Sequence, residues 1–340
     1  MAGVADAGGR EYLRMKPGQP IQHANDSTPR WLRRFTKLVA ASTLFLIFAG
    51  AMVTSTGSGL AVPDWPNTYG WFMFAFPFKH WVGGIFYEHG HRLIASTVGF
   101  LTVIQALWLQ RREPKRFVRR LGWLSLGAVL VQGLLGGLTV ILLLPLAISV
   151  AHAALAEIFL CLNVSIAFFT SRWYEDLRKY EKGDAPVGMA WSLTAIVYAQ
   201  ILAGALMRHL GAGLAIPDFP RSFGRWIPPF DSINVVAAFV HRAGGFLVAA
   251  MVLAMVVRLL RFERDHPLRF LAHLLLVVVS AQVLLGAYVI WSGKQPILTS
   301  LHVMNGALTL ALSLILTLAT RTVAWRVVRP GALIATEVPA

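Results

Sequence analysis

The chain carries one sequence pattern twice. Residues 49–70 (AGAMVTSTGSGLAVPDWPNTYG) recur as residues 203–224 (AGALMRHLGAGLAIPDFPRSFG). Two histidines follow each copy, and both pairs are separated by the same 61 positions: His91 and His152, then His241 and His302. The duplication predicts two copies of one folding unit, each with its own histidine pair.

The composition places this duplicated unit in a membrane. The 340 residues are 56% hydrophobic and 14% charged, with a mean hydropathy of +0.61, which is too apolar for a soluble protein of this size. A spanning helix needs about 20 largely apolar residues, and eight such runs occur. We expect helices near residues 35–54, 91–110, 120–141, 147–170, 189–208, 236–258, 269–291 and 299–320. Pro145 marks a tight turn between the third and the fourth, because a single helix through both would overshoot the bilayer.

Four spans in each half determine the expected topology. An even number returns the chain to the same side, so the two repeats are predicted to be parallel and related by a pseudo-twofold axis along the membrane normal. The fold class is therefore an all-α polytopic membrane protein of two four-helix bundles. The expected parts are a cytoplasmic tail (1–34), an N-terminal bundle (35–170), a cytoplasmic linker (171–188), a C-terminal bundle (189–321) and a second cytoplasmic tail (322–340).

The net charge of +15 follows the predicted topology. Of 31 Lys and Arg residues, 24 fall in the tails and in the loops that these spans place on one side of the bilayer. This asymmetry is the positive-inside rule, so both termini are expected in the cytoplasm, and nucleic acid is not an expected partner. The first 30 residues lack an apolar core and resemble neither a cleavable signal nor a typical transit peptide. We expect an integral plasma membrane protein of a prokaryote.

The four repeated histidines are candidate ligands for haem. All four lie where even-numbered spans begin on the extracytoplasmic side, so both predicted sites are near the outer surface. A single histidine in an apolar helix is more often a packing residue, but four at duplicated spacing favour a site, since polar groups in the membrane are costly. No Asp, Glu or Cys occurs at matching positions in both halves. Two imidazoles poorly satisfy tetrahedral zinc, whereas haem supplies four nitrogens and needs only axial ligands.

Charged residues beside the histidines differ between the halves. Glu88 stands three residues before His91, whereas Ala238 occupies the matching position in the second half. A carboxylate at one pair only indicates proton chemistry at the first site and cofactor binding alone at the second; the alternative is a solvated acid at the loop end. Arg92 and Arg242 are candidates for binding a haem propionate, and snorkelling to the interface is an equal alternative.

Other polar residues in the predicted spans have structural interpretations. Gln132 and Gly136 recur as Gln282 and Gly286, and we expect helix packing and interhelical hydrogen bonds from them. Glu157, which has no acidic counterpart, is expected first as a buried interhelical contact.

The outer loops repeat a proline-rich core. Pro63–Pro66 (PDWP) matches Pro217–Pro220 (PDFP), a composition typical of fixed turns in which Asp accepts hydrogen bonds. Each outer loop has around 30 residues, which is long enough to fold over a site as a lid. The aromatic residues of the loops could equally be interfacial anchors.

In combination, these motifs resemble the heme A synthase family over about residues 35–321. The resemblance rests on the loop Gly57–Gly70, Glu88-x-x-His91-Arg92, His152, His241-Arg242 and His302, in register with eight spans. It implies a membrane enzyme that oxidises the C8 methyl of heme O to the formyl of heme A by successive hydroxylations, for terminal oxidase assembly. Partners implied are heme O synthase, oxidase assembly factors and an unidentified electron acceptor.

The resemblance also implies roles for the site residues. His91 and His152 would hold the substrate haem, with Glu88 assisting catalysis, and His241 and His302 would ligate a haem b. Some family members carry a cysteine pair in the first outer loop, where this sequence has Val62 and Thr68, so a mechanism that needs those thiols cannot operate here. Two other classes fit part of the pattern: a di-haem b-type electron-transfer cytochrome, and a transporter with parallel repeats.

Overall fold

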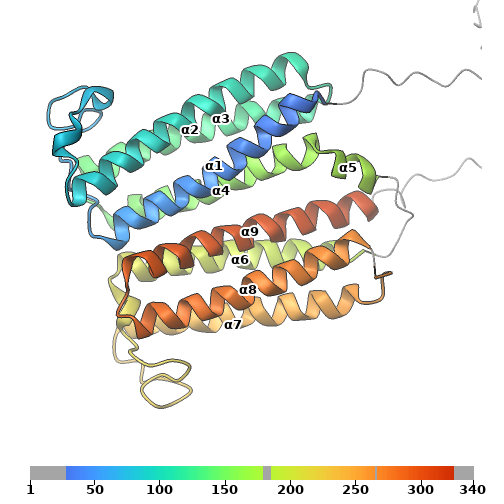
Figure 1. Ribbon diagram of the computed structural model, residues 1–340. Coiled ribbons are helices and arrows are strands. Elements are labelled where there is room, and N and C mark those ends of the chain that lie inside the picture. The colour runs from blue at the N-terminus through green and yellow to red at the C-terminus, as the bar shows by residue number, and fades with distance from the viewer. Residues whose placement is uncertain (1–27, 179–184, 265, 325–340) are drawn as a thin grey trace, which may run out of the picture.

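Eight long helices dominate the computed structural model, which describes residues 28–178, 185–264 and 266–324 (Figure 1). All eight are long and apolar enough to span a membrane. They are α1 (Arg30–Ser55), α2 (Gly84–Arg112), α3 (Arg116–Ile141), α4 (Leu146–Thr170), α6 (Val187–His209), α7 (Ile233–Leu259), α8 (Pro267–Trp291) and α9 (Pro296–Ala324). The described part of the chain contains no β-strand, only two isolated bridges in the loops. The prediction of an all-helical membrane protein with eight spans is confirmed, and the parts of the predicted tails at 1–27 and 325–340 lie outside the described residues.

The helices begin earlier than the sequence analysis placed them, and this changes the position of the histidines. Helix α2 starts at Gly84, directly after Gly83, whose φ of +54° breaks the preceding chain. His91 therefore lies seven residues inside α2, and the other three histidines lie six to eight residues inside their helices. At 1.5 Å per residue this is roughly 9–12 Å below the helix ends. Their predicted location at the first turn is corrected, because the apolar residues before each histidine continue the helix outwards.

Two shorter features connect the spans. The predicted turn at Pro145 is confirmed: α3 ends at Ile141, Leu143 and Leu144 take positive φ values, and Pro145 caps α4. The six-residue helix α5 (Arg172–Leu177) was not predicted. It forms because the Ser171 hydroxyl accepts a hydrogen bond from the Tyr174 N–H at 3.1 Å, which caps its first turn.

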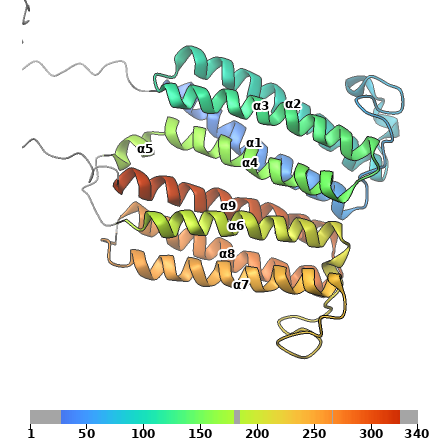
Figure 2. The ribbon, with the colours of Figure 1, turned by 180° about the vertical axis from the view of Figure 1, so that it is seen from behind.

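The helices contact each other in two groups. Helices α1 to α4 pack in a closed ring, and α6 to α9 pack in another, as the views from both sides show (Figures 1 and 2). The groups meet where α1 lies on α9 and where α4 lies on α6 and α9. Both long loops, 56–83 and 210–232, are at one end of the bundle, while α5, the start of α1 and the end of α9 are at the other.

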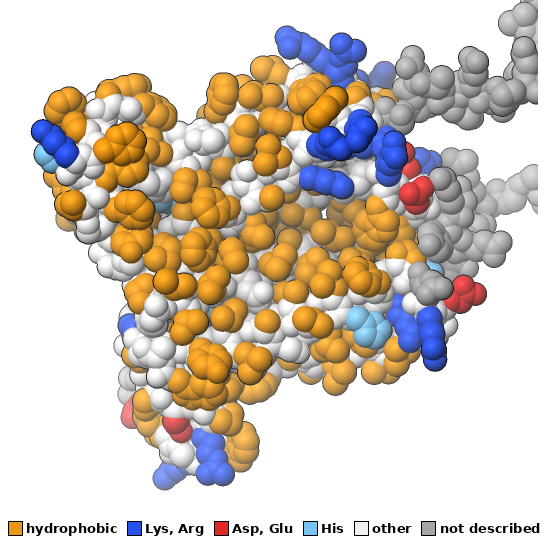
Figure 3. Space-filling view, viewed as in Figure 1, with side chains coloured by type: hydrophobic (Ala, Val, Ile, Leu, Met, Phe, Trp, Pro, Cys, Tyr) orange, Lys and Arg blue, Asp and Glu red, His pale blue; other side chains and the backbone are white. Residues whose placement is uncertain are grey.

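The outer surface of the bundle has the pattern of a membrane protein. Hydrophobic side chains cover its middle, and Lys and Arg gather at the end that carries α5 and on the outer loops (Figure 3). Most spans bury only 17–28% of their most apolar window, whereas α4 and α9 bury 44% and 61%. The two helices that carry His152 and His302 near their start, α4 and α9, are therefore the most buried of the eight spans.

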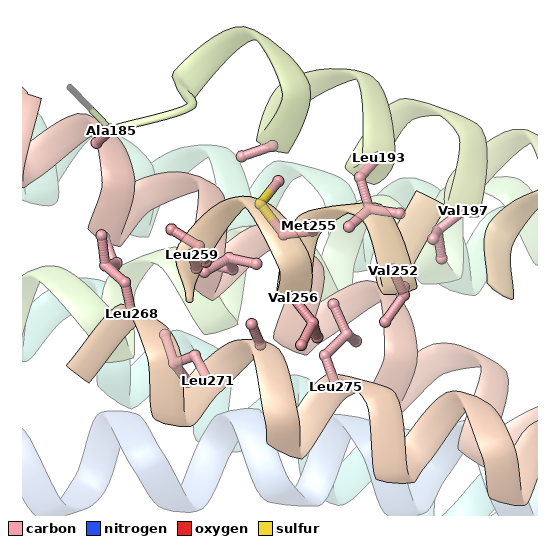
Figure 4. Packing of buried hydrophobic residues seen from close by; sticks show 14 of the residues in the cluster. Ala185, Leu193, Val197, Val252, Met255, Val256, Leu259, Leu268, Leu271 and Leu275 are labelled. Carbon is pink, nitrogen blue, oxygen red and sulfur yellow. The ribbon is translucent and has the colours of Figure 1, made fainter. Parts of the chain in front are cut away.

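The largest apolar cluster fills the C-terminal group away from the histidines. Leu193 of α6, Met255 of α7 and Leu275 of α8 are among its fully buried members (Figure 4). On α7 the buried members begin at Val248, two turns beyond His241. On α7 the largest cluster therefore stops before His241, and a smaller cluster that includes Val235 and Ala238 lies on the other side of this histidine.

A partly buried arginine ties the two groups of helices together. Arg208 of α6 donates through Nη2 to the carbonyl oxygen of Ala51 at 2.9 Å and to the hydroxyl of Ser55 at 2.8 Å, both on α1. Ser300 of α9 donates to the same Ser55 hydroxyl at 3.1 Å. A charge carried by the second group is therefore satisfied by the first.

Candidate functional site

The N-terminal histidines lie on facing helices, each against a glycine of a neighbouring helix. His91 of α2 packs its ring on Gly50 of α1, where a Cβ atom would lie 3.0 Å from the ring carbon Cε1. His152 of α4 packs in the same way on Gly136 of α3, with a corresponding distance of 3.2 Å. The two imidazoles are close enough to interact electrostatically. The helix-packing role expected for Gly136 is therefore specific: this glycine makes room for an imidazole.

The C-terminal histidines repeat this arrangement. His241 of α7 packs on Gly204 of α6, where a Cβ would lie 2.6 Å from Cε1, and His302 of α9 packs on Gly286 of α8, at 3.1 Å. The ring centroids of His241 and His302 are 6.3 Å apart, with an interplanar angle of 79°. Residues 61 positions apart in the sequence are thus brought together in an edge-to-face arrangement.

The geometry of this pair fits a haem. Two metal–imidazole bonds of about 2.0–2.1 Å, each extended by about 1 Å to the ring centre, place two axial imidazoles roughly 6 Å apart. The observed 6.3 Å between His241 and His302 matches that span. The Nδ1 atoms of His91, His152 and His302 are buried without a hydrogen-bond partner, and no described residue bonds Nε2 of His241. Each imidazole therefore has one ring nitrogen without a hydrogen-bond partner among the described residues.

A protein-only metal site is absent from the described residues. No group of three or more His, Cys, Asp or Glu side chains comes together there. The single cysteine, Cys161, is a free thiol on α4. Since the histidines occur only as pairs in the described part of the chain, their residue types suit a group that brings further ligands of its own, and the haem assignment stays a prediction.

Three glutamines hold the histidines from the neighbouring helices. The amide nitrogen of Gln132 donates to the backbone carbonyl of His152 at 2.9 Å, and that of Gln282 donates to the carbonyl of His302 at 3.0 Å. Gln200 does the same to His241 at 2.6 Å, and its amide nitrogen is 3.0 Å from Nδ1 of that ring. Interhelical hydrogen bonding by Gln132 and Gln282 is confirmed.

Gln200 was not predicted from the sequence, although a repeated spacing of glutamine and glycine marks its position. Each of the three glutamines stands four residues before the glycine that receives the imidazole: Gln132 before Gly136, Gln200 before Gly204 and Gln282 before Gly286. One helical turn separates the two positions, so both face the same histidine-bearing helix. The pattern Gln-x-x-x-Gly could have been found by comparing helices rather than halves.

Glu88 lies inside α2 and is fully engaged. One carboxylate oxygen pairs with Arg92 at 2.7 Å, and the other accepts a hydrogen bond from the Val62 N–H at 2.8 Å. Glu88 is 4% exposed, so it is not the solvated loop-end acid of the alternative interpretation. Ala238, at the matching position of α7, is also buried and supplies no carboxylate. The predicted asymmetry between the two sites is therefore present in the structure.

The two arginines anchor the outer loops. Arg92 donates to the backbone carbonyls of Val62, Asp64 and Asn67 at 2.7–3.0 Å. Arg242 donates in the same way to the carbonyls of Ile216, Asp218 and Arg221, which occupy the matching loop positions. Both guanidinium groups thus hold a loop beside a histidine, which is a more specific role than snorkelling.

An aspartate shapes each loop from within. Asp64 accepts the N–H groups of Tyr69 and Gly70 at 2.7 and 2.8 Å, and Asp218 accepts those of Phe223 and Gly224 at the same distances. Partial burial alone would raise the pKa of Asp64, but these two backbone hydrogen bonds outweigh it and lower the pKa. The Gly224 N–H likewise lowers the pKa of Asp218. The predicted turn role of both aspartates is confirmed.

The loop aromatics pack against the helices. A Cβ on Gly137 of α3 would lie 2.6 Å from the indole of Trp65, so this ring rests directly on the helix that carries Gly136. In the second loop, Phe219 stacks with Phe246 of α7 at a centroid distance of 6.4 Å. These contacts favour the interpretation of the loops as covers over the histidine-bearing ends.

The remaining polar candidates lie at the margins of the sites. His89 is fully buried, and its Nδ1 lies 3.1 Å from the Thr68 hydroxyl, so it anchors the first loop. His209, at the end of α6, interacts electrostatically with His152. Glu157 is buried in α4, and its Oε2 has no hydrogen-bond partner among the described residues.

The fold and the site together define a class: a polytopic helical membrane protein with two matched histidine pairs inside its spans. The model of the COX15-CtaA family, described as cytochrome oxidase assembly protein, matches residues 75–314. The chain belongs to this family.

Relatives in three organisms carry the same name. The chain is 27% identical to the heme A synthase of Halalkalibacterium halodurans, over 81% of this chain and 92% of that protein. It is 29% identical to the heme A synthase of Symbiobacterium thermophilum, over 75% and 84%, and 27% identical to that of Shouchella clausii, over 76% and 86%. The resemblance to heme A synthases drawn from the histidine motifs is thereby confirmed.

Proposed function

We propose that this protein is a heme A synthase, an oxidoreductase that converts the C8 methyl group of heme O to the formyl group of heme A. The observation that carries the proposal is the presence of two matched histidine pairs, of which only the first has a buried carboxylate beside it. The names of the relatives agree with this activity. A second hydroxylation of the same carbon gives a geminal diol, which loses water to leave the formyl group.

The two halves are proposed to have different roles: the first binds the substrate haem, and the second holds a resident haem. His91 and His152 bind the substrate, heme O, and release the product, heme A. His241 and His302 hold a resident haem b, whose iron supplies a one-electron redox centre when bound. The 6.3 Å between the rings of His241 and His302 supports a site that needs little rearrangement to accept it.

Glu88 is proposed as the catalytic acid–base group of the first site. It lies one turn before His91 on α2, where both residues face the same side of the helix. Its carboxylate is held in place by Arg92 and by the Val62 N–H. A buried, oriented carboxylate beside the substrate can accept a proton released as the methyl carbon is oxidised.

Arg92 and Arg242 are proposed to order the loops over the haem edges. Most of their N–H groups already serve loop carbonyls. An arginine fixed in this way can offer a remaining N–H group to a propionate without losing further side-chain freedom, because its position is already set.

The proposed orientation places the sites on the extracytoplasmic side. The start of α1, the end of α9 and α5 share the end of the bundle where Lys and Arg gather, which supports cytoplasmic termini. A pseudo-twofold axis along the membrane normal would exchange the contact of α1 with α9 for that of α6 with α4, and both contacts occur. Heme O synthase, oxidase assembly factors and an electron acceptor are proposed partners.

Haem identification tests the activity. The full-length protein would be purified from cells that supply heme O, and its pigments extracted and separated. Heme O, a hydroxylated intermediate or heme A beside haem b is the expected result. Haem b alone would instead support the electron-transfer cytochrome, and absence of Soret absorption would support the transporter.

Glu88→Gln tests the catalytic assignment. Glutamine keeps an acceptor for the Val62 N–H but removes the negative charge, so we expect heme O to accumulate while haem b is retained. Glu113→Gln, which removes a buried carboxylate at the other end of α2, serves as the matched control and should leave conversion near the wild-type level. Normal heme A formation by the Glu88 variant would remove this residue from the chemistry.

A further inference from the structure

The four histidine-bearing helices are held in a common way, with one exception. In three cases, the helix that precedes the histidine helix carries Gln-x-x-x-Gly, at Gln132, Gln200 and Gln282. The glycine receives the imidazole, and the glutamine donates to the histidine's backbone carbonyl at 2.6–3.0 Å. Helix α1 carries the glycine, Gly50, but has Leu46 where the glutamine would stand.

The exception removes a specific contact from His91. Leucine has no donor, and no described side chain donates to the His91 carbonyl. His91 is therefore the only one of the four candidate ligands that lacks a side-chain hydrogen bond from the helix behind it, within the residues that the structure describes.

The residue that faces Gln200 from α7 also differs between the two halves. Gln200 fits because Gly244 of α7 has no side chain; a Cβ there would collide with Oε1 of Gln200. In the first half, the residues at these matching positions are Leu46 and Ile94. The pair is thus glutamine with glycine behind His241, and leucine with isoleucine behind His91. Both positions change together, so a single substitution would not interconvert the two environments.

We propose that this difference makes His91 the exchangeable axial ligand, through which heme O enters and heme A leaves, while Gln200 makes His241 a permanent one. The inference rests on the proposed function, which requires one haem to turn over and the other to stay. Gln132, Gln200 and Gln282 act as positioning residues. Exchange is a change of ligand alone: the iron–nitrogen bond to His91 breaks, its electron pair remains on the imidazole, and no group is oxidised or reduced.

The magnitude expected follows from the role of groups behind a metal ligand. Partners that accept the second ring N–H of a ligating histidine typically contribute about 10–100-fold to metal affinity, and we take the same range for glutamines that orient the histidine through its backbone carbonyl. With Leu46 in place of a glutamine, His91 should bind iron more weakly by about this factor. His241, which keeps Gln200, should bind iron more strongly. His152 keeps its glutamine, so the substrate remains attached on one face while the other is released.

Reciprocal exchange of the two pairs tests the inference. One variant, Leu46→Gln with Ile94→Gly, gives the first half the pair found behind His241. The other, Gln200→Leu with Gly244→Ile, gives the second half the pair found behind His91. Each full-length variant, loaded with heme O and haem b, would be mixed with excess apomyoglobin, and the haem type transferred would be followed over time by extraction. Electron paramagnetic resonance of the ferric protein would report the low-spin signal of bis-histidine haem.

The expected results are opposite for the two variants. The first should release heme O and heme A about 10-fold more slowly than the wild type, with an unchanged rate for haem b. The second should release haem b about 10–100-fold faster and convert part of its low-spin signal to high spin. A merely structural role for these residues predicts no slowing from the first exchange. The unmodified half of each variant serves as its internal control for folding.

Two outcomes would overturn the inference, and they differ from failure of the proposed function. Equal release of both haems by the wild type would show that His91 is not the weaker ligand. Unchanged release rates in both variants would show that the glutamines do not determine retention, although haem identification would still support the synthase. A wild-type protein without bound haem would overturn the proposed function and this inference with it.

Discussion

Gly204→Ala should expel haem from the C-terminal site although it adds a single methyl group. The new Cβ would lie 2.6 Å from Cε1 of His241, whereas carbon atoms in contact are about 3.5–4.0 Å apart. The ring must therefore move by about 1 Å, which is about half the length of a metal–nitrogen bond and would weaken haem binding. Overpacking of this kind costs about 1–3 kcal/mol, which corresponds to a roughly 10- to 100-fold loss of haem affinity.

The other three histidine-facing glycines provide a graded series. The corresponding distances are 3.0 Å at Gly50, 3.1 Å at Gly286 and 3.2 Å at Gly136, so alanine should perturb their sites less than at Gly204. Gly133, on α3 with nothing within 4 Å of its ideal Cβ, is the matched control. Alanine there should stabilise the helix by about 0.5–1 kcal/mol.

Haem content and the low-spin signal of each purified variant would measure the effect. The reasoning predicts that Gly204→Ala loses haem b while the occupancy of the first site is unchanged. A full haem complement and a wild-type spectrum in this variant would refute it. Equal losses in the Gly133→Ala variant would also refute it, because that substitution contacts no imidazole.

Two predictions concern the first outer loop. Because hydrogen bonds from the loop backbone lower the pKa of Asp64, its stabilisation of the loop is complete above the ordinary aspartate pKa of about 3.9 and is lost only as the pH falls through the lowered value. Amide exchange at Gly70 should therefore stay slow from neutral pH down to about pH 4, and Asp64→Asn should accelerate it at neutral pH. Gly137→Ala would place a Cβ 2.6 Å from the Trp65 ring, so this ring should be displaced from α3, with a changed tryptophan emission and faster cleavage of the loop by protease.

Each loop prediction has a clear counter-result. Slow exchange at Gly70 in the Asp64→Asn protein would show that the carboxylate does not hold the turn. Gly127→Ala on the same helix as Gly137 meets nothing within 4 Å and is the control for the second prediction. Identical protease sensitivity of the two alanine variants would contradict the docking of Trp65 on α3.

The sequence predicts the spans and the histidine pairs because both follow from simple periodic constraints. Eight apolar runs near the length of a bilayer crossing leave little freedom in the number of helices, and duplication identifies His91 with His241 without any structure. The sequence does not show how far the histidines lie from the ends of their helices. The outer ends of α2 and α7 continue through residues such as Ile85 and Asn234, where no hydropathy boundary marks the helix start.

The supporting residues were harder to predict because they act across helices. Gln200 has no counterpart at the matching position in the first half, so comparison of the halves alone passes over it. Arg92 and Arg242 bond to loop carbonyls, and a backbone conformation that presents three carbonyls to one guanidinium cannot be read from residue types. The buried state of Glu88 depends on the loop folding back to Val62, a contact 26 positions apart in the chain.

The link through Arg208 bears on how such a duplicated protein can be divided. Its guanidinium is solvated by α1, on the far side of the boundary between the two helix groups, and a cation stranded in an apolar environment is costly. If the two halves were separated, Arg208 would lose both acceptors, and the Ala51 carbonyl and the Ser55 hydroxyl on the other half would lose their donor. We therefore expect fragments separated between α5 and α6 to associate through this contact, so that the two groups of helices would not be independent units.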